Sequence, residues 1–100
     1  EELLTLLKVS DSIYEANARI EIEEIEEAFG VDFLVDKADE DVETLGGFVV
    51  SIEGRVPQTG EIIPHPLGYK FEILDADPRK VKKIRVHLPK KSIEDNLDGD

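Results

Sequence analysis

The sequence contains no cysteine, no methionine and no tryptophan, and the first two absences bear on the chemistry and the origin of the chain. Without cysteine there is no disulfide, no thiolate chemistry and no cysteine-ligated zinc site. A start methionine is also absent, so we expect the chain to be an excised piece of a longer protein. No apolar run approaches the roughly 20 residues that span a bilayer, and nothing resembles a signal peptide. The 100 residues indicate one domain with a single modest core.

The charge is strongly negative but unevenly distributed along the chain. The formal net charge is −12; residues 1–53 contain 3 basic and 16 acidic side chains, whereas residues 54–100 contain 9 and 8. Residues 79–91 hold seven basic side chains and no acidic one. Because nucleic-acid binders gain much of their affinity by neutralising phosphates, the overall sign argues against a nucleic-acid partner.

No arrangement of residues in the sequence indicates catalysis. No serine lies in a nucleophile-elbow pattern, and no His–Asp–Ser order stands out. Acidic residues are numerous, but a catalytic pair is defined by its environment, which spacing does not give. The two histidines, His65 and His87, are compatible with a metal site, although their spacing fits no local motif. We therefore expect a protein that is not an enzyme.

Residues 44–61 carry the clearest structural signals. Thr44 is a suitable helix N-cap, and Gly54 follows where a left-handed residue would end the helix. Between them, apolar residues fall on one helical face: Leu45, Phe48, Val49 and Ile52. The alternative is a strand, because the β-branched residues in this stretch favour strands and the pair Gly46-Gly47 weakens a helix. We favour the helix, in which the two glycines allow another backbone to come close.

The rest of the N-terminal half predicts a strand, a helix and a loop. Residues 1–11 are compatible with a linker remnant or a short amphipathic helix, and residues 12–17 with a short strand. The stripe within residues 22–29 predicts a helix that ends at Gly30. Residues 31–43 are acidic, and we expect them to form a surface loop.

The C-terminal half predicts antiparallel strands. The prolines around residues 61–64 confine that strand to an edge. Residues 69–73 and 81–88 alternate and are joined by a turn at residues 77–80, with an irregularity at Val81. We predict a domain over residues 12–89 and a disordered acidic tail over residues 90–100. The fold class is α+β: a small, mostly antiparallel sheet of about four strands with two helices packed on one face.

Two groups of residues are candidate binding sites. For Mg²⁺ or Ca²⁺ the candidates are the acidic residues Asp36, Asp39, Glu40 and Asp41, although they lack the EF-hand pattern and a solvated loop explains them better. For an anionic ligand the candidates are Gly46, Gly47, Arg55, Arg79, Lys83 and Arg85. The alternatives are that the basic hairpin faces the acidic half of the chain and that Arg55 pairs with a nearby carboxylate or with helix-end carbonyls.

Several motifs resemble the CorC/HlyC transporter-associated domain. They are Thr44-Leu45-Gly46-Gly47, Gly54-Arg55-Val56-Pro57, Gly60-Glu61, Phe71-Glu72-Ile73-Leu74-Asp75-Ala76-Asp77, and Arg79, Val81 and Ile84-Arg85-Val86. The resemblance covers about residues 12–88. It departs at Asn17, where the family usually has a glycine after its first strand.

The resemblance implies a regulatory module at the C-terminus of a bacterial membrane or membrane-associated protein, on the cytoplasmic side and after a paired CBS module. Such proteins are linked to magnesium and cobalt efflux or called hemolysins. The family fold is similar to a subdomain of vanillyl-alcohol-oxidase-type flavin enzymes, which implies FAD or adenine-nucleotide binding by analogy. The alternatives are a protein-interaction or homodimerisation module without a ligand, and a flavin-binding unit.

Overall fold

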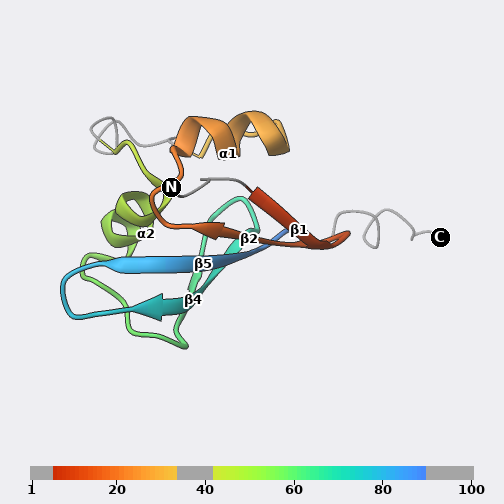
Figure 1. The fold of residues 1–100 in the computed structure, drawn as a ribbon. Helices are drawn as coiled ribbons and strands as arrows, with labels where there is room; N and C mark the ends of the chain where they lie inside the picture. Colours follow the sequence, from red (N-terminus) through yellow and green to blue (C-terminus); the bar gives the residue numbers. More distant parts are fainter. Residues whose placement is uncertain (1–5, 34–41, 90–100) are drawn as a thin grey trace, which may run out of the picture.

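The structure is a computed structural model that describes residues 6–33 and 42–89. It contains one five-stranded antiparallel sheet with the order β1-β2-β5-β4-β3, together with two helices (Figure 1). The elements are β1 (Leu6–Ser10), β2 (Ile13–Asn17), α1 (Ile22–Phe29), α2 (Leu45–Glu53), β3 (Ile62–Pro64), β4 (Lys70–Ala76) and β5 (Val81–His87). This confirms the α+β class, with one strand more than predicted.

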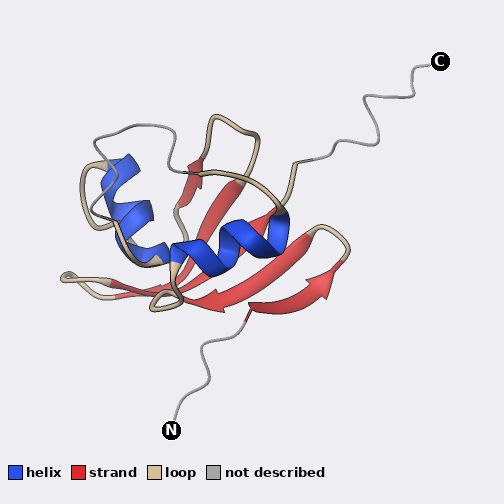
Figure 2. Ribbon diagram, turned by 90° about the horizontal axis from the view of Figure 1, so that it is seen from above, coloured by secondary structure: helices blue, strands red, loops and turns tan. Residues whose placement is uncertain are grey.

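Both helices lie on the same face of the sheet, and no helix or strand of the described residues covers the opposite face, which we call the open face (Figure 2). The core fills the space between these layers. Its central members are fully buried apolar side chains from both helices and from β4 and β5: Ile22, Ile25, Phe48, Val49, Phe71, Ile73, Ile84 and Val86. The sheet is therefore amphipathic, with apolar residues inward and charged residues outward, as the alternation in β4 and β5 predicts.

The two helices begin and end at the predicted residues. In α2 the Thr44 hydroxyl accepts a hydrogen bond from the Gly47 N–H at 3.1 Å, which is a side-chain N-cap. The helix ends at Gly54, which has a φ of 84°. In α1 the left-handed residue is Gly30, with a φ of 68°. The strand alternative for residues 45–53 is therefore wrong.

Residues 6–10 form a strand, which corrects the interpretation of this part of residues 1–11 as a linker remnant or a short helix. Leu6 pairs with Ala16 and Leu7 with Glu15, so β1 adds an edge strand beside β2. The short apolar run has no clear period, and pairing with β2 decides its conformation. At the end of β2, Asn17 has a negative φ, and its Oδ1 accepts the Arg19 N–H at 2.8 Å. This Asx turn forms without a positive φ, so Asn17 does not need the backbone freedom of the glycine that the resemblance implies at this position.

We predicted a surface loop for the connection after α1, but this is wrong for its first residues, because Phe33 is only 1% exposed. Its ring packs between helix and sheet, with its centroid 4.9 Å from that of Tyr69 and 5.8 Å from that of Phe48. The Glu26 carboxylate accepts the Phe33 N–H at 2.8 Å and thereby fixes the chain as it leaves α1. A single phenylalanine in an acidic segment has no periodic partner, so the sequence pattern missed it.

The β4–β5 turn is built as predicted. The Asp77 carboxylate accepts the N–H groups of Arg79 and Lys80, at 2.8 and 2.9 Å. The pairing register shifts in β4 between Ile73 and Ala76, opposite the start of β5. This irregularity lets Val81 and Ile84 both face the core although they are three residues apart, which confirms the predicted irregularity at Val81.

A tight crossing holds α2 against the chain that follows β2. The Gly46 N–H donates to the Ala18 carbonyl and the Leu45 N–H to the Ile20 carbonyl, both at 2.9 Å. A Cβ atom on Gly46 would lie 2.8 Å from the Ala18 Cβ. The close backbone approach predicted for the glycine pair is therefore found at Gly46, whereas a Cβ on Gly47 would meet only the Thr44 hydroxyl.

Candidate functional site

A shallow groove lies between the start of α2 and the β4–β5 turn, which occupy the same end of the molecule (Figure 1). Its volume is about 330 Å³. The rim carries three cationic residues, Arg19, Arg79 and Lys80, and the floor is apolar. We call it the basic groove; its lining residues are Ala18, Arg19, Thr44, Gly46, Gly47, Val50, Val56, Arg79, Lys80 and Val81.

The amides at the start of α2 already have acceptors. The Leu45 and Gly46 N–H groups donate to backbone carbonyls, and the Gly47 N–H donates to the Thr44 hydroxyl. A phosphate-binding helix start needs amides that point at the ligand. The glycine pair therefore shapes the basic groove, and the charged groups that face an anion there are side chains.

The open face of the sheet carries a ladder of ion pairs across three strands. Arg85 of β5 stands directly opposite Glu15 of β2 and Glu72 of β4. Its Nη2 lies 2.8 Å from the Glu15 Oε2, and its Nη1 lies 3.7 Å from the Glu72 Oε1. His87 Nε2 contacts the same Glu72 oxygen at 2.9 Å, and Lys83 reaches Glu15 at 3.8 Å. The hydrogen bond with Glu15 raises the pKa of Arg85.

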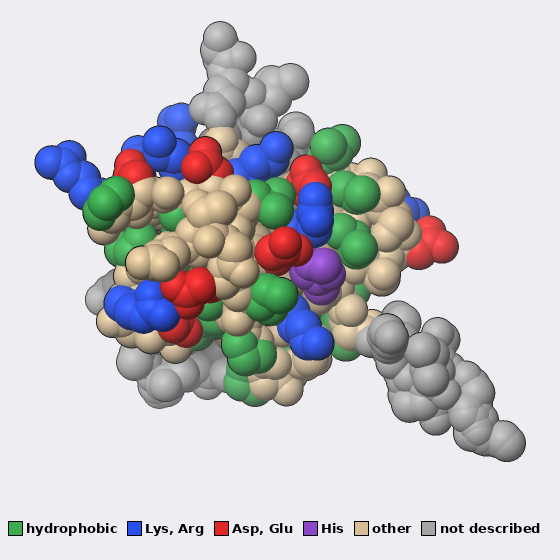
Figure 3. Space-filling view, turned by 90° about the horizontal axis from the view of Figure 1, so that it is seen from below, with side chains coloured by type: hydrophobic (Ala, Val, Ile, Leu, Met, Phe, Trp, Pro, Cys, Tyr) green, Lys and Arg blue, Asp and Glu red, His purple; other side chains and the backbone are tan. Residues whose placement is uncertain are grey.

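Figure 3 shows this open face, on which acidic, basic and hydrophobic side chains and a histidine are interleaved. The same row of the sheet ends in exposed apolar residues: Leu7 pairs with Glu15 at one edge, and Ile62 pairs with Glu72 at the other. Leu7 is 61% exposed and Ile62 is 54% exposed. Lys83 and Arg85 therefore belong to an internal charge network, which supports the alternative that the basic strand faces acidic residues.

Arg55 pairs with carboxylates beside the end of α2. Its guanidinium donates two hydrogen bonds to the Glu61 carboxylate, at 2.8 and 3.1 Å, and also lies 3.1 Å from Glu53. The hydrogen bond from Arg55 and that from the Gln58 N–H lower the pKa of Glu61. This confirms the prediction that Arg55 pairs with a nearby carboxylate.

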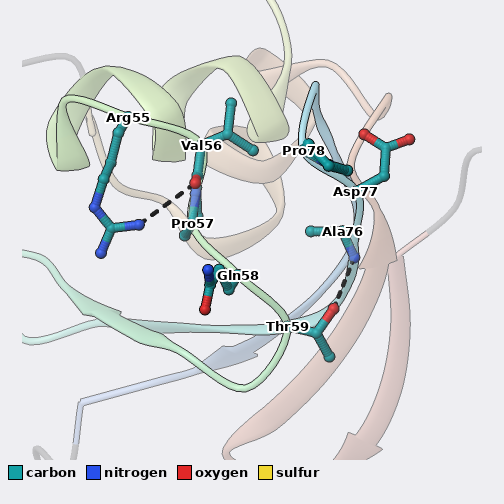
Figure 4. Close-up of a pocket in the computed structure, with 8 residues that line it drawn as sticks. All are labelled: Arg55, Val56, Pro57, Gln58, Thr59, Ala76, Asp77 and Pro78. Carbon is teal, nitrogen blue, oxygen red and sulfur yellow. Dashed lines mark hydrogen bonds between the residues drawn. The ribbon is translucent and has the colours of Figure 1, made fainter.

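A second groove, of about 440 Å³, separates residues 55–59 from residues 76–78 (Figure 4). The Thr59 hydroxyl accepts the Ala76 N–H at 3.0 Å and closes one end. In Figure 4 the Arg55 side chain extends away from Asp77 and Pro78 on the far wall. The Arg55 charge is directed to Glu61, and the Asp77 carboxylate accepts the amides of its own turn, so the two charged residues that line this groove do not converge in it.

The structure brings together three of the six predicted anion-site residues. Gly46, Gly47 and Arg79 line the basic groove, whereas Arg55, Lys83 and Arg85 lie elsewhere in ion pairs. Sequence reasoning missed Arg19 and Lys80. For Lys80 the signal was its place in the turn after Asp77, whereas only the crossing of residues 18–20 over α2 brings Arg19 to the groove.

The predicted metal residues Asp36, Asp39, Glu40 and Asp41 lie outside the described residues, so that site stays a prediction. Within residues 6–33 and 42–89, no three His, Asp or Glu side chains are grouped to hold a metal ion. The two histidines do not meet. His65 is buried with Phe33, Phe48 and Phe71 in the core, and His87 lies on the open face.

Together these features define the class of protein: a small α+β domain with one helix-covered face and one charged, open face. None of the helices in the described part of the chain is long and apolar enough to cross a membrane. The sequence pattern of the CorC_HlyC family, described as a transporter associated domain, matches residues 7–90. The chain belongs to this family.

Relatives and solved structures agree with the assignment. The chain is 40% identical over 89 residues to a magnesium and cobalt efflux protein CorC from Buchnera aphidicola, covering 89% of this chain and 29% of that protein. It is similar to a CorC transporter-associated region from Neisseria meningitidis, with a TM-score of 0.73, 28% identity and coverage of 83% and 96%. A CorC_HlyC domain of a Xylella fastidiosa hemolysin gives a TM-score of 0.70, 26% identity and coverage of 90% and 100%.

Proposed function

We propose that this domain is a non-catalytic accessory domain of a bacterial magnesium and cobalt efflux protein, and that it modulates ion transport. The observation that carries the proposal is the family match together with the relatives' length. The chain spans 29% of the Buchnera efflux protein and 32% of its Escherichia coli counterpart. Because the domain corresponds to only about a third of such a protein, we assign the transport path to the other parts and a regulatory or assembly role to this domain.

The open face of the sheet supports contact with a neighbouring domain. The ion-pair ladder runs along its middle, and the exposed side chains of Leu7 and Ile62 flank the ladder at the two edges. Such an apolar and charged mixture is typical of an interface between domains of one protein. The family resemblance implies a CBS module as the neighbour, on the cytoplasmic side of the membrane.

The test uses the full-length protein that carries this domain, produced at matched levels in cells that lack their own efflux protein. Cobalt efflux is compared among the intact protein, a deletion of residues 7–90 and the double variant Leu7→Ser/Ile62→Ser. We expect both changes to alter the efflux rate or its dependence on cytoplasmic cobalt. Ala28→Ser, at an exposed position of α1, is the matched control and should behave as the wild type.

If the deletion changes neither the efflux rate nor its dependence on cytoplasmic cobalt, the proposal is overturned. If the deletion acts but the double variant does not, the accessory role stands and the open face is not the contact. Binding of FAD or an adenine nucleotide, and homodimerisation, stay predictions from the resemblance. Visible absorbance of the purified chain, a thermal shift with nucleotide, and its mass in sedimentation equilibrium test them separately.

A further inference from the structure

We propose that the basic groove binds a phosphate monoester attached to a small apolar body. The proposal is independent of the transport role, because it concerns only what the groove recognises. Cationic side chains at the rim meet the phosphate, and the apolar floor meets the rest of the ligand. The volume of about 330 Å³ lies at the small end of the range for small-molecule sites.

Charge distinguishes this groove from the rest of the molecule. The chain carries a net charge of −12, yet the groove lining includes three cations and no carboxylate. Within the described residues, Arg79 and Lys80 form no ion pair, whereas Lys82, Lys83 and Arg85 all do. Lys80 lies near enough to Asp77 to help lower the pKa of that carboxylate, but neither Lys80 nor Arg79 is held in an ion pair among the described residues, so both are available to a ligand's negative charge.

The two cations are carried on a backbone that is already ordered. The Asp77 carboxylate accepts both of their amides, and the Asp77 N–H donates to the Lys80 carbonyl at 3.0 Å. The turn therefore needs no ordering when a ligand arrives, which limits the entropic cost of binding to the side chains. A guanidinium beside an ammonium suits a phosphate dianion, because the guanidinium donates two parallel hydrogen bonds.

The floor determines the second part of the ligand. Val50 and Val56 are half-buried and Val81 is buried, so an apolar surface lies below the cations. Gly47 is exposed and has no side chain, so it does not cover this apolar surface. A Cβ at Gly47 would meet only the Thr44 hydroxyl, at 3.2 Å. A phosphate without an apolar body leaves this surface in water, so it should bind more weakly.

The experiment is a titration of the ¹⁵N-labelled 100-residue chain with phenyl phosphate, followed by amide chemical shifts. We expect saturable shifts centred on Gly46, Gly47, Lys80 and Val81. Inorganic phosphate should shift the same amides with at least about threefold weaker affinity, because it leaves the floor uncovered. The variant Arg79→Gln/Lys80→Gln should weaken phenyl phosphate binding at least about tenfold. Its turn amides still donate to Asp77, so it should fold.

Lys83→Gln is the control for charge lost outside the groove: it removes one ammonium group from the open face, and we expect less than a twofold change in affinity. Vesicles containing 30 mol% phosphatidic acid distinguish a lipid headgroup from a soluble ester. Binding of vesicles that Arg79→Gln/Lys80→Gln abolishes and Lys83→Gln does not would assign the ligand to a membrane. Shifts centred on other amides, or no saturable binding of either phenyl phosphate or the phosphatidic acid vesicles, would overturn the proposal. Equal losses of affinity in Arg79→Gln/Lys80→Gln and Lys83→Gln would also overturn it.

Discussion

At the scale of single residues, Gly46 and Gly47 have the same side chain but different reasons to be glycine. Gly46 lies under the Ala18 backbone, which it approaches so closely that its N–H bonds the Ala18 carbonyl. Gly47 is one residue further along the helix and exposed. Helix propensity disfavours both glycines about equally, so a larger loss of stability in the Gly46 variant than in the Gly47 variant measures chiefly the close approach to Ala18.

We expect Gly46→Ala to lower the free energy of unfolding by about 1–3 kcal/mol, because the new methyl group forces Ala18 and α2 apart. Gly47→Ala is the matched control and should stay within about 1 kcal/mol of the wild type, since it gains helix propensity and presses only on the Thr44 hydroxyl. Urea unfolding followed by circular dichroism measures both. Equal effects of the two variants would show that the crossing tolerates a side chain.

Two carboxylates make stability depend on pH in a defined direction. The pKa of Glu61 is lowered by Arg55, and that of Asp77 by the amides of Arg79 and Lys80. A folded-state pKa below the unfolded value of about 4 contributes stability above that value, and the contribution is lost as the pH falls through the folded pKa. Stability should therefore decrease on acidification below about pH 5.

The double variant Glu61→Gln/Asp77→Asn should lose part of this dependence, so its unfolding midpoint in urea should fall less steeply between pH 5 and pH 3 than that of the wild type. Glu27→Gln, which neutralises an exposed carboxylate on α1, is the control and should leave the slope nearly unchanged. An equal flattening in both variants would mean that general charge, rather than these two contacts, sets the acid response.

At the scale of elements, the segment that leaves α1 connects the helices with the sheet. Phe33 enters the core between Tyr69 and Phe48, and its carbonyl faces the Nε2 of the buried His65 at 3.4 Å. The Leu67 N–H donates to the His65 Nδ1 at 3.1 Å, so the Nε2 carries the ring proton and donates to Phe33. One apolar residue thus joins an acidic connection, α2 and the end of β3.

We predict that Phe33→Ala lowers the free energy of unfolding by about 3–5 kcal/mol, the usual cost of emptying a phenylalanine site in a core. Ile62→Ala, which truncates an exposed apolar side chain on β3, should cost less than about 0.5 kcal/mol. Thermal and urea unfolding measure both. If Phe33→Ala does not fold, Phe33→Leu provides a graded second variant. A small effect at Phe33 would contradict its place in the core.

For the whole molecule, the balance of charge matters more than any single ion pair. The net charge of −12 makes repulsion a destabilising term in the folded state. The ion pairs that oppose it are partly exposed, and salt weakens them too. The repulsion acts between charges far apart on the molecule, whereas the two charges of an ion pair lie within about 4 Å of each other. Salt therefore weakens the repulsion more strongly than it weakens the ion pairs.

The melting temperature should therefore rise by several degrees when sodium chloride is increased from 10 to 300 mM at pH 7, since the screening length falls from about 30 Å to below 10 Å. Differential scanning calorimetry measures the change. Arg85→Met, which breaks the ladder, should melt at a lower temperature but keep the same direction of salt dependence. A melting temperature that falls with salt would show that the ion pairs dominate.

The sequence by itself determined the parts of this protein that depend on near neighbours. The Thr44 cap, the glycines that end both helices and the Asp77 turn each act within a few residues, so composition and spacing predict α1, α2 and the β4–β5 hairpin. The strand alternation likewise identified the buried faces of β4 and β5. Of the motifs that carry the family resemblance, some lie in α2 and the β4–β5 hairpin, and others lie in the connection between α2 and β3.

Only the tertiary structure decided what depends on contacts between distant residues. It made residues 6–10 an edge strand, placed Phe33 in the core and joined Arg85 to Glu15 and Glu72 from two other strands. It also separated the predicted anion site, directing Arg55 to Glu61 and bringing Arg19 to Arg79. Capping and turn chemistry are local, whereas strand pairing, burial and charge partners are settled by which segments meet in three dimensions.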